Sequence, residues 1–170
     1  MLLEPLAIEG GDLPAPLRAE LAGLYASNVA FFTLSGDFPD PLRITAEQVA
    51  ASVRDDLAHD GAEYLLARDG DGALVGIAAT AAVHPDPADP YPWIGLLLVH
   101  GERHREGLGG RLAGLVEDRF RAAGRPGVRL AVLENNPKGL AFWTARGYEV
   151  VDRRLDRGAG RPCVVMEKRF

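Results

Sequence analysis

The stretch Val99-His-Gly-Glu-Arg-His-Arg-Glu-Gly-Leu-Gly-Gly-Arg111 decides the fold of this chain. It follows an apolar run over residues 94–99 and leads directly into a helical pattern, so a strand, a glycine-rich turn and a helix are predicted in succession. The amide N–H groups of a first helical turn have no partner inside the helix, and the helix dipole favours negative charge there. Glycines in the turn let the backbone approach a bulky anion. The stretch therefore predicts a site for a phosphorylated ligand.

Two common phosphate-binding motifs do not fit this turn. A dinucleotide fingerprint places G-x-G-x-x-G in the first βαβ unit, whereas here Leu112 stands in place of the third glycine and the turn lies past mid-chain. A P-loop requires a lysine after its glycines, and none follows these. The segment His104-Arg-Glu-Gly-Leu-Gly109 is instead close to the [QR]-x-x-G-x-[GA] loop that holds the pyrophosphate of acetyl-CoA, with His104 in the usual Gln or Arg position.

A second motif lies about thirty residues further along. Residues 129–134 alternate like a strand, Asn136 then stands at a helix N-cap position, and Pro137 occupies the first helical position. The string Asn136-Pro-Lys-Gly-Leu-Ala-Phe-Trp-Thr-Ala-Arg-Gly-Tyr148 resembles the N-x-x-A-x-x-[FL]-[YW]-x-x-x-G-[FY] motif of the GNAT N-acetyltransferase superfamily. Both motifs occur in the order found in that family, and the resemblance covers most of the chain.

The pattern along residues 1–170 predicts a single α/β domain. Strands are expected near 2–8, 63–68, 74–83, 94–99, 129–134, 149–155 and 163–168, and helices near 13–25, 45–57, 108–120 and 136–147. Asp12 is expected to cap the first helix, and Thr45 with Gln48 to form a capping box on the second. The resemblance implies a mixed central sheet of about six or seven strands flanked by about four helices, with strands four and five splayed apart.

Composition excludes several classes of protein. The net charge of -5 argues against a general nucleic-acid binder, and no apolar run approaches the length of a membrane span. The N-terminal residues lack a basic region followed by an apolar core, so no signal peptide is expected. The single cysteine, Cys163, fits a reducing compartment. These features predict a cytoplasmic protein with no nucleic-acid or membrane partner; a homodimer is left open.

By resemblance, acetyl-CoA is the co-substrate, and several positions are expected to hold it. The backbone of Leu97, Leu98 and Val99 would pair with the pantetheine arm like an added strand. The pyrophosphate would be held by the amides of residues 105–110, namely Arg105, Glu106, Gly107, Leu108, Gly109 and Gly110. Asn136 and Trp143 complete the expected cofactor side.

Two positions depart from the family pattern where catalysis is concerned. Trp143 stands where many members carry a tyrosine that is thought to protonate the leaving thiolate, and an indole N–H is no usable acid. Gly95 lies near the position of a glutamate used by some relatives, which leaves Glu134, at a strand end, as the candidate proton acceptor through water. No metal site is expected, because no Glu follows His100 as an H-E-x-x-H zinc motif requires.

The acceptor is expected between two long loops, residues 26–44 and 84–92, with Asp37, Phe38 and Tyr91 as candidate contacts. The resemblance implies an N-acetyltransferase that moves an acetyl group to a primary amine by direct attack in a ternary complex. A small-molecule amine, a peptide N-terminus and a protein lysine all stay open. Two alternatives remain: a catalytically silent acyl-CoA-binding module, and a phosphate-ligand binder unrelated to acyl-CoA.

Overall fold

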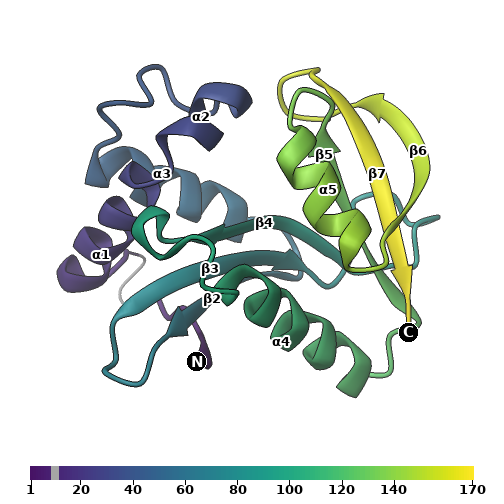
Figure 1. Cartoon of the computed structure of the whole chain (residues 1–170), viewed down its shortest axis with the longest axis horizontal. Coiled ribbons are helices and arrows are strands. Elements are labelled where there is room, and N and C mark those ends of the chain that lie inside the picture. The colour runs from purple at the N-terminus through teal and green to yellow at the C-terminus, as the bar shows by residue number, and fades with distance from the viewer. Residues whose placement is uncertain (9–11) are drawn as a thin grey trace.

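One mixed sheet of seven strands organises the computed structural model, which describes residues 1–8 and 12–170 (Figure 1). Its strand order is β1-β2-β3-β4-β5-β7-β6, and neighbours are antiparallel except for the parallel pair β4 and β5. The strands are β1 (Leu2–Pro5), β2 (Ala62–Arg68), β3 (Leu74–Ala81), β4 (Trp93–Val99), β5 (Gly127–Leu133), β6 (Glu149–Leu155) and β7 (Pro162–Arg169). The predicted mixed sheet is thereby confirmed.

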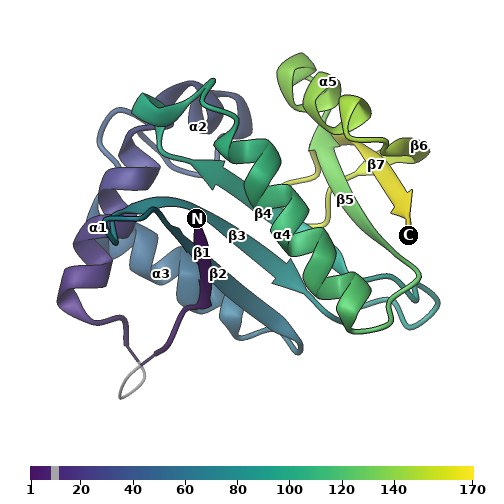
Figure 2. The same ribbon diagram turned by 60° about the horizontal axis from the view of Figure 1, so that its bottom comes forward.

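Helices cover both faces of this sheet (Figure 2). They are α1 (Ala15–Ala26), α2 (Val29–Ser35), α3 (Ala46–Leu57), the 3-10 helix η1 (Gly101–Arg103), α4 (Leu108–Ala122) and α5 (Pro137–Ala145). Alternate residues of each strand face opposite sides, so Tyr64 and Ile77 pack with α1 and α3, whereas Leu65 and Val75 pack with α4. Two hydrophobic cores result, one on each face.

Of two predicted helix N-caps, the one at Thr45 is confirmed and the one at Asp12 is wrong. Thr45 forms the expected capping box, because its hydroxyl accepts from the Gln48 amide at 3.2 Å and the Gln48 side chain accepts from the Thr45 amide at 2.9 Å. Asp12 does not cap α1; Pro14 holds the N-cap position. Asp12 lies two residues before that position, and its carboxylate pairs with Arg18 at 2.7 Å and with Arg54 at 2.9 Å.

Helix α2 was not expected, since residues 26–44 had the composition of a long connection. Its N-cap residue, Asn28, makes no side-chain capping bond, so the usual start signal is missing. The helix is held by burial of Phe32, which stacks on Tyr25 with ring centroids 5.2 Å apart. It ends at Gly36, whose φ of 69° is a left-handed conformation that glycine adopts at little cost.

The centre of the sheet is splayed, as predicted. Strands β4 and β5 pair only at Trp93 with Arg129 and at Ile94 with Leu130, and they diverge beyond these positions (Figure 1). A β-bulge adds to this opening: Ala79 pairs with Leu96 and Thr80 with Ile94, which leaves Gly95 outside the register. The bulge turns Ile94 toward the α4 core and its near neighbour Leu96 toward the α1 and α3 core.

None of the helices in residues 1–8 and 12–170 has the length and apolarity that crossing a membrane requires.

Candidate functional site

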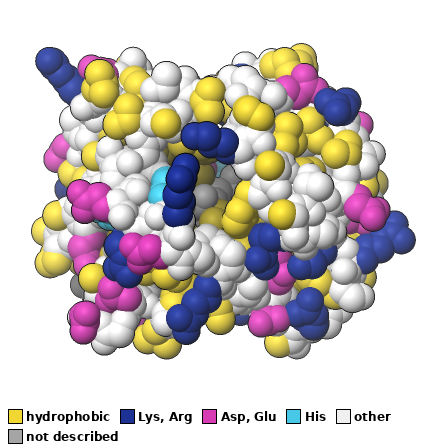
Figure 3. Space-filling model, viewed as in Figure 1, with side chains coloured by type: hydrophobic (Ala, Val, Ile, Leu, Met, Phe, Trp, Pro, Cys, Tyr) yellow, Lys and Arg dark blue, Asp and Glu magenta, His cyan; other side chains and the backbone are white. Residues whose placement is uncertain are grey.

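A cavity of about 810 Å³ occupies the splay between β4 and β5. Figure 3 shows a hollow near the middle of this face, with lysine or arginine side chains and a histidine at its rim. Besides strand residues, the cavity is lined by the glycine turn, by α5 and by part of α2. The arginine, lysine and histidine side chains in the lining are Arg103, His104, Arg105, Lys138 and Arg161. Their excess over the two lining carboxylates, Asp37 and Asp156, favours an anionic ligand.

The N-terminus of α4 opens into this cavity without a cap. Gly107 is the N-cap residue, with φ 77°, and no side chain among the described residues caps the free amides of the first turn. A Cβ on Gly107 would meet no atom within 4 Å, so space lies directly beside these amides. Arg105 also adopts a left-handed φ of 67°, which is uncommon for a residue with a Cβ. An uncapped fifteen-residue helix beside cationic side chains fits a phosphate group.

The edge of β4 offers backbone groups to the same cavity. The carbonyl of Leu98 faces β3, because a Cβ on Gly76 would come within 2.7 Å of it. Backbone groups alternate in direction along a strand, so the N–H and C=O of Leu97 and Val99 face the splay. Of the three residues predicted to pair with the pantetheine arm, Leu97 and Val99 therefore present their backbone to the cavity, and Leu98 does not.

One of these groups is already used within the protein. The Val99 carbonyl accepts hydrogen bonds from Asn28 Nδ2 at 3.1 Å and from His104 Nε2 at 2.9 Å. Because a carbonyl only accepts, His104 must carry its proton on Nε2. The imidazole that replaces the usual Gln or Arg thus ties the glycine turn to the strand before it. Asn28 is buried, with 7% of its surface exposed, and also donates to the Leu24 carbonyl at 2.9 Å.

Helix α5 forms the opposite wall of the cavity. Asn136 caps the helix as predicted, since its Oδ1 accepts from the Gly139 amide at 3.0 Å. Trp143 is 8% exposed, lines the cavity, and packs edge-on against Phe142 and Tyr148, with both ring centroids 4.9 Å away. Tyr148 cannot replace the missing tyrosine, because its hydroxyl points to Glu117 at 3.4 Å inside the core. Burial, together with the Glu117 carboxylate, raises the pKa of Tyr148 well above its ordinary value.

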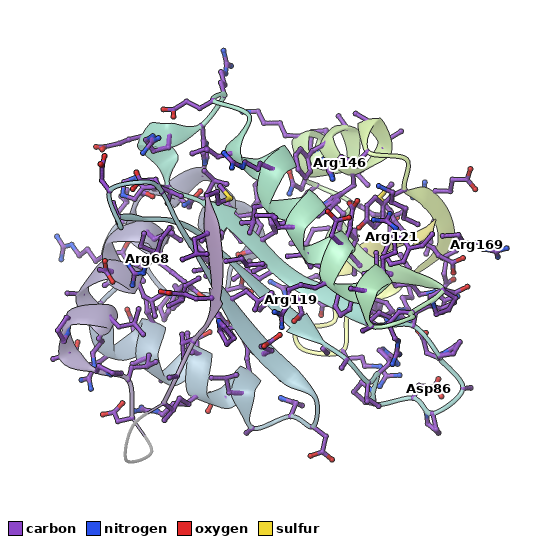
Figure 4. All side chains as sticks on the ribbon, turned by 90° about the horizontal axis from the view of Figure 1, so that it is seen from below. Arg68, Asp86, Arg119, Arg121, Arg146 and Arg169 are labelled. Atoms are coloured by element: carbon purple, nitrogen blue, oxygen red, sulfur yellow. The ribbon has the colours of Figure 1, made fainter. Side chains whose placement is uncertain are left out.

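A buried charge cluster fixes α5 against α4. Glu117 is 4% exposed and accepts from Arg146 at 3.1 Å and from Lys168 at 2.7 Å. The guanidinium of Arg146 crosses α4 close to Gly110 and Gly114, where a Cβ would lie 3.4 and 3.6 Å from its nitrogens. Figure 4 shows Arg146 beside the α4 ribbon. These contacts position the wall that carries Trp143 relative to the helix that carries the glycine turn.

Besides Phe38, which lines a second cavity described below, three predicted site residues do not send their side chains into this cavity. Glu134 accepts from Arg153 Nη1 at 2.9 Å and is absent from the cavity lining. The Glu106 carboxylate pairs with Arg103 Nε at 2.8 Å. Tyr91 lies at the other end of β4, where its ring packs under the Arg129 guanidinium at 4.4 Å, away from both the cavity and Asp37. The acceptor loop expected at residues 84–92 therefore does not reach the splay through Tyr91.

A second cavity, of about 640 Å³, lies on the α1 and α3 face of the sheet. Asp37 and Phe38, both predicted contacts, line it. Sequence reasoning did not single out its other polar residues, because Tyr25 and Tyr64 fit core positions and Asp55 and Asp56 fit a solvated helix end. The full polar lining is Tyr25, Asp37, Gln48, Ser52, Asp55, Asp56, Tyr64 and Arg161.

The two cavities share one border. Asp37, Gly95, Leu96 and Arg161 line both of them. A Cβ added to Gly95 would have the Ala79 carbonyl oxygen, 3.8 Å away, as its one neighbouring atom within 4 Å in the described structure. The bulged residue therefore leaves space between the two cavities. Two ligands, one in each cavity, would therefore meet at the β4 bulge.

Comparison with known proteins agrees with this geometry. Residues 28–148 match the family described as the Acetyltransferase (GNAT) family, and the chain belongs to this family. No curated protein matches the chain.

Solved structures share the fold at low sequence identity. An acetyltransferase from Thermus thermophilus superimposes with a TM-score of 0.73 at 19% identity, covering 100% of this chain and 98% of that one. PaiA N-acetyltransferase from Thermoplasma acidophilum, solved in complex with coenzyme A, gives 0.65 at 18% identity and covers 100% of both chains. A spermidine N-acetyltransferase SpeG chimera from Vibrio cholerae and hSSAT gives 0.66 at 13% identity, covering 99% and 96%.

Proposed function

We propose that this protein transfers an acetyl group from acetyl-CoA to a primary amine by direct attack in a ternary complex. The observation that carries the proposal is the meeting of two cavities at Gly95 and Leu96. One cavity has cationic side chains and an uncapped helix N-terminus, and the other has carboxylates. Each matches the charge of one reactant, and the shared border brings the reactants together without a covalent enzyme intermediate.

The residues around the first cavity fit acetyl-CoA. The pyrophosphate would lie at the first-turn amides of α4, with Arg105 and Lys138 supplying charge. The backbone N–H and C=O of Leu97 and the N–H of Val99 would pair with the amides of the pantetheine arm, since the Val99 carbonyl is already bonded to Asn28 and His104. Asn136 and Trp143 would bound its other side, and the Trp143 indole offers an apolar surface for the arm.

Acetyl-CoA supplies a thioester that an uncharged amine can attack, with the C–N bond forming as the C–S bond breaks. Overall, one proton leaves the nitrogen and one reaches the sulfur. Trp143 cannot provide the second proton, and a thiol with a pKa of about 8.5 is a fair leaving group without an acid. Glu134 is held by Arg153 outside the cavity, so we assign the first proton to water at the bulge rather than to this carboxylate.

The test is turnover of acetyl-CoA with a panel of primary amines, followed through release of the free thiol. Turnover with initial-velocity lines that intersect supports direct transfer in a ternary complex. Parallel lines would contradict it, because they indicate a covalent intermediate. Tight acetyl-CoA binding with no turnover on any amine would favour the silent acyl-CoA-binding module, which the Trp143 substitution and the absence of a carboxylate at Gly95 allow. We retain the cytoplasm as the proposed compartment.

A further inference from the structure

We infer that the second cavity, here called the acidic cavity, binds the distal ammonium group of a diamine, so that the acceptor is an alkyl chain with a cation at each end. This inference rests on the proposed function and names the substrate class of that site. The acidic cavity is the roughly 640 Å³ space between α2, α3 and the sheet. The acceptor inferred here is a small, flexible dication and not a lysine side chain of a protein.

The charges of the lining favour a cation. Asp37, Asp55 and Asp56 contribute three carboxylates, and among the described residues Arg161 is the one lysine or arginine in the lining. Arg161 is already neutralised, because it pairs with Asp37 at 2.7 Å and with Asp156 at 2.5 Å. Asp55 and Asp56 are therefore left to set the net charge of the cavity, and together they match more than one positive charge on a ligand.

Independent of these carboxylates, a buried hydroxyl in the same lining lacks a partner at normal distance. Tyr25 is 1% exposed, and the nearest partner of its hydroxyl is the Tyr64 hydroxyl at 3.5 Å. That separation is well beyond the usual range for two hydroxyl groups. Tyr64 donates instead to Asp56 Oδ2 at 2.5 Å. A buried polar group without a good partner is costly, and an ammonium donor in the cavity would satisfy the Tyr25 oxygen.

The register of the sheet gives the length of the acceptor. Tyr64 pairs with Ala79, and Ala79 pairs with Leu96, so Tyr64 lies two strands away from the bulge on the same face. Two strand spacings are about 10 Å. An amine at the bulge and an ammonium beside the Tyr64 and Asp56 pair would then be roughly 6–10 Å apart. An extended chain of about four to seven methylene groups spans that distance.

The experiment compares kcat/KM for n-hexylamine and hexamethylenediamine, with shorter and longer diamines on either side. The two ligands share the reactive amine and the chain, and differ only in the distal cation. We expect the diamine to be favoured by about 10- to 100-fold, the effect of one charged hydrogen bond in a partly buried site. Equal kcat/KM for the two amines would overturn the inference while leaving acetyl transfer intact.

Variants assign the effect to the cavity. Asp56→Asn should raise the KM for hexamethylenediamine about tenfold or more, while leaving n-hexylamine unchanged. Asp60→Asn is the matched control, since Asp60 is an exposed carboxylate near the end of α3 that does not line the cavity. The control should behave as the wild type. Equal losses on both amines in Asp56→Asn would overturn the inference, because a distal cation contact affects only the diamine.

A binding measurement separates this inference from the proposed function. Hexamethylenediamine is titrated calorimetrically into protein saturated with coenzyme A, so no turnover is needed. Binding that weakens in Asp56→Asn but not in Asp60→Asn supports the acidic cavity even if no amine is acetylated. No binding to the wild-type protein would overturn it, whereas absence of turnover alone would count only against the proposed function.

Discussion

Gly109 faces the cavity at the start of α4, beside Phe142 and Val99. An added Cβ would lie 3.6 Å from the Phe142 ring and 3.8 Å from Val99 Cγ2, which is ordinary contact. Gly109→Val should therefore fold, while its methyl groups occupy the space proposed for the phosphates. We expect acetyl-CoA affinity to fall by at least about tenfold, measured by calorimetry. Gly114→Ala on the same helix, outside the cavity lining, should bind normally. Unchanged acetyl-CoA affinity in Gly109→Val would mean that the pyrophosphate does not bind at this turn.

Trp143 tests whether an acid is needed at its position. Its indole makes edge contacts with Phe142 and Tyr148, so Trp143→Phe keeps the apolar surface and should retain most of the turnover. Trp143→Tyr should give little gain, or a modest gain if the hydroxyl reaches the sulfur. Steady-state rates with any working amine measure both. A loss of several hundredfold in Trp143→Phe, with acetyl-CoA affinity and fold intact, would mean that the indole N–H takes part in catalysis, because such losses are typical of removing an acid.

A third prediction concerns the effect of Asp56 on stability at different pH. Burial raises the pKa of this carboxyl above its ordinary value, although the hydrogen bond from Tyr64 opposes the shift. The folded protein therefore binds more protons than the unfolded chain between the two pKa values, and stability falls as the pH rises through that window. Asp56→Asn should raise the melting temperature at neutral pH, and this gain should vanish below the ordinary pKa. A lower melting temperature in the variant at neutral pH would contradict this account. A carboxylate that costs stability is consistent with a role in binding.

At the scale of elements, the wall between α4 and α5 depends on Glu117. Removal of this carboxylate leaves Arg146 and Lys168 without their shared partner in a largely buried place. We expect Glu117→Ala to lower the free energy of unfolding by about 3 kcal/mol, as for other broken buried ion pairs. Denaturant titration measures the change.

The matched control is Glu63→Ala, which removes the partner of Arg119. That pair is about as short, at 2.9 Å, but both side chains are more than a third exposed. A loss of no more than about 1 kcal/mol is expected there. Similar losses for Glu63→Ala and Glu117→Ala would mean that burial does not set the strength of the Glu117 cluster.

Elements with local signals were predictable from the sequence. The capping box at Thr45 and the cap at Asn136 are interactions within four residues, so residue order alone encodes them. The bulge at Gly95 was not predictable, because residues 94–99 are a continuous apolar run with no visible break in alternation. Helix α2 was missed for a related reason: its stability comes from the packing of Phe32 on Tyr25 and Phe38, which is a tertiary effect.

At the scale of the whole molecule, the two cavities of the site also differ in how far local sequence predicts them. The predicted backbone turn, Asn136 and Trp143 line the first cavity, because the cofactor side is built from two contiguous motifs. The acidic cavity collects residues from α1, α2, α3, β2 and the β4 bulge, which only the fold brings together. No periodicity marks Tyr25, Asp56 and Tyr64 as neighbours, so beyond Asp37 and Phe38 the lining of the acidic cavity could not be derived from the sequence.

The bulge at Gly95 and Leu96 also divides the chain by role. Apart from Arg161, every residue that lines the acidic cavity precedes position 97, whereas the residues proposed to hold acetyl-CoA run from Leu97 to Trp143. On the proposed function, residues before position 97 therefore bind the acceptor and residues 97–143 bind the acetyl donor. On that function, substitutions before position 97 can change the acceptor while the acetyl-CoA site stays the same.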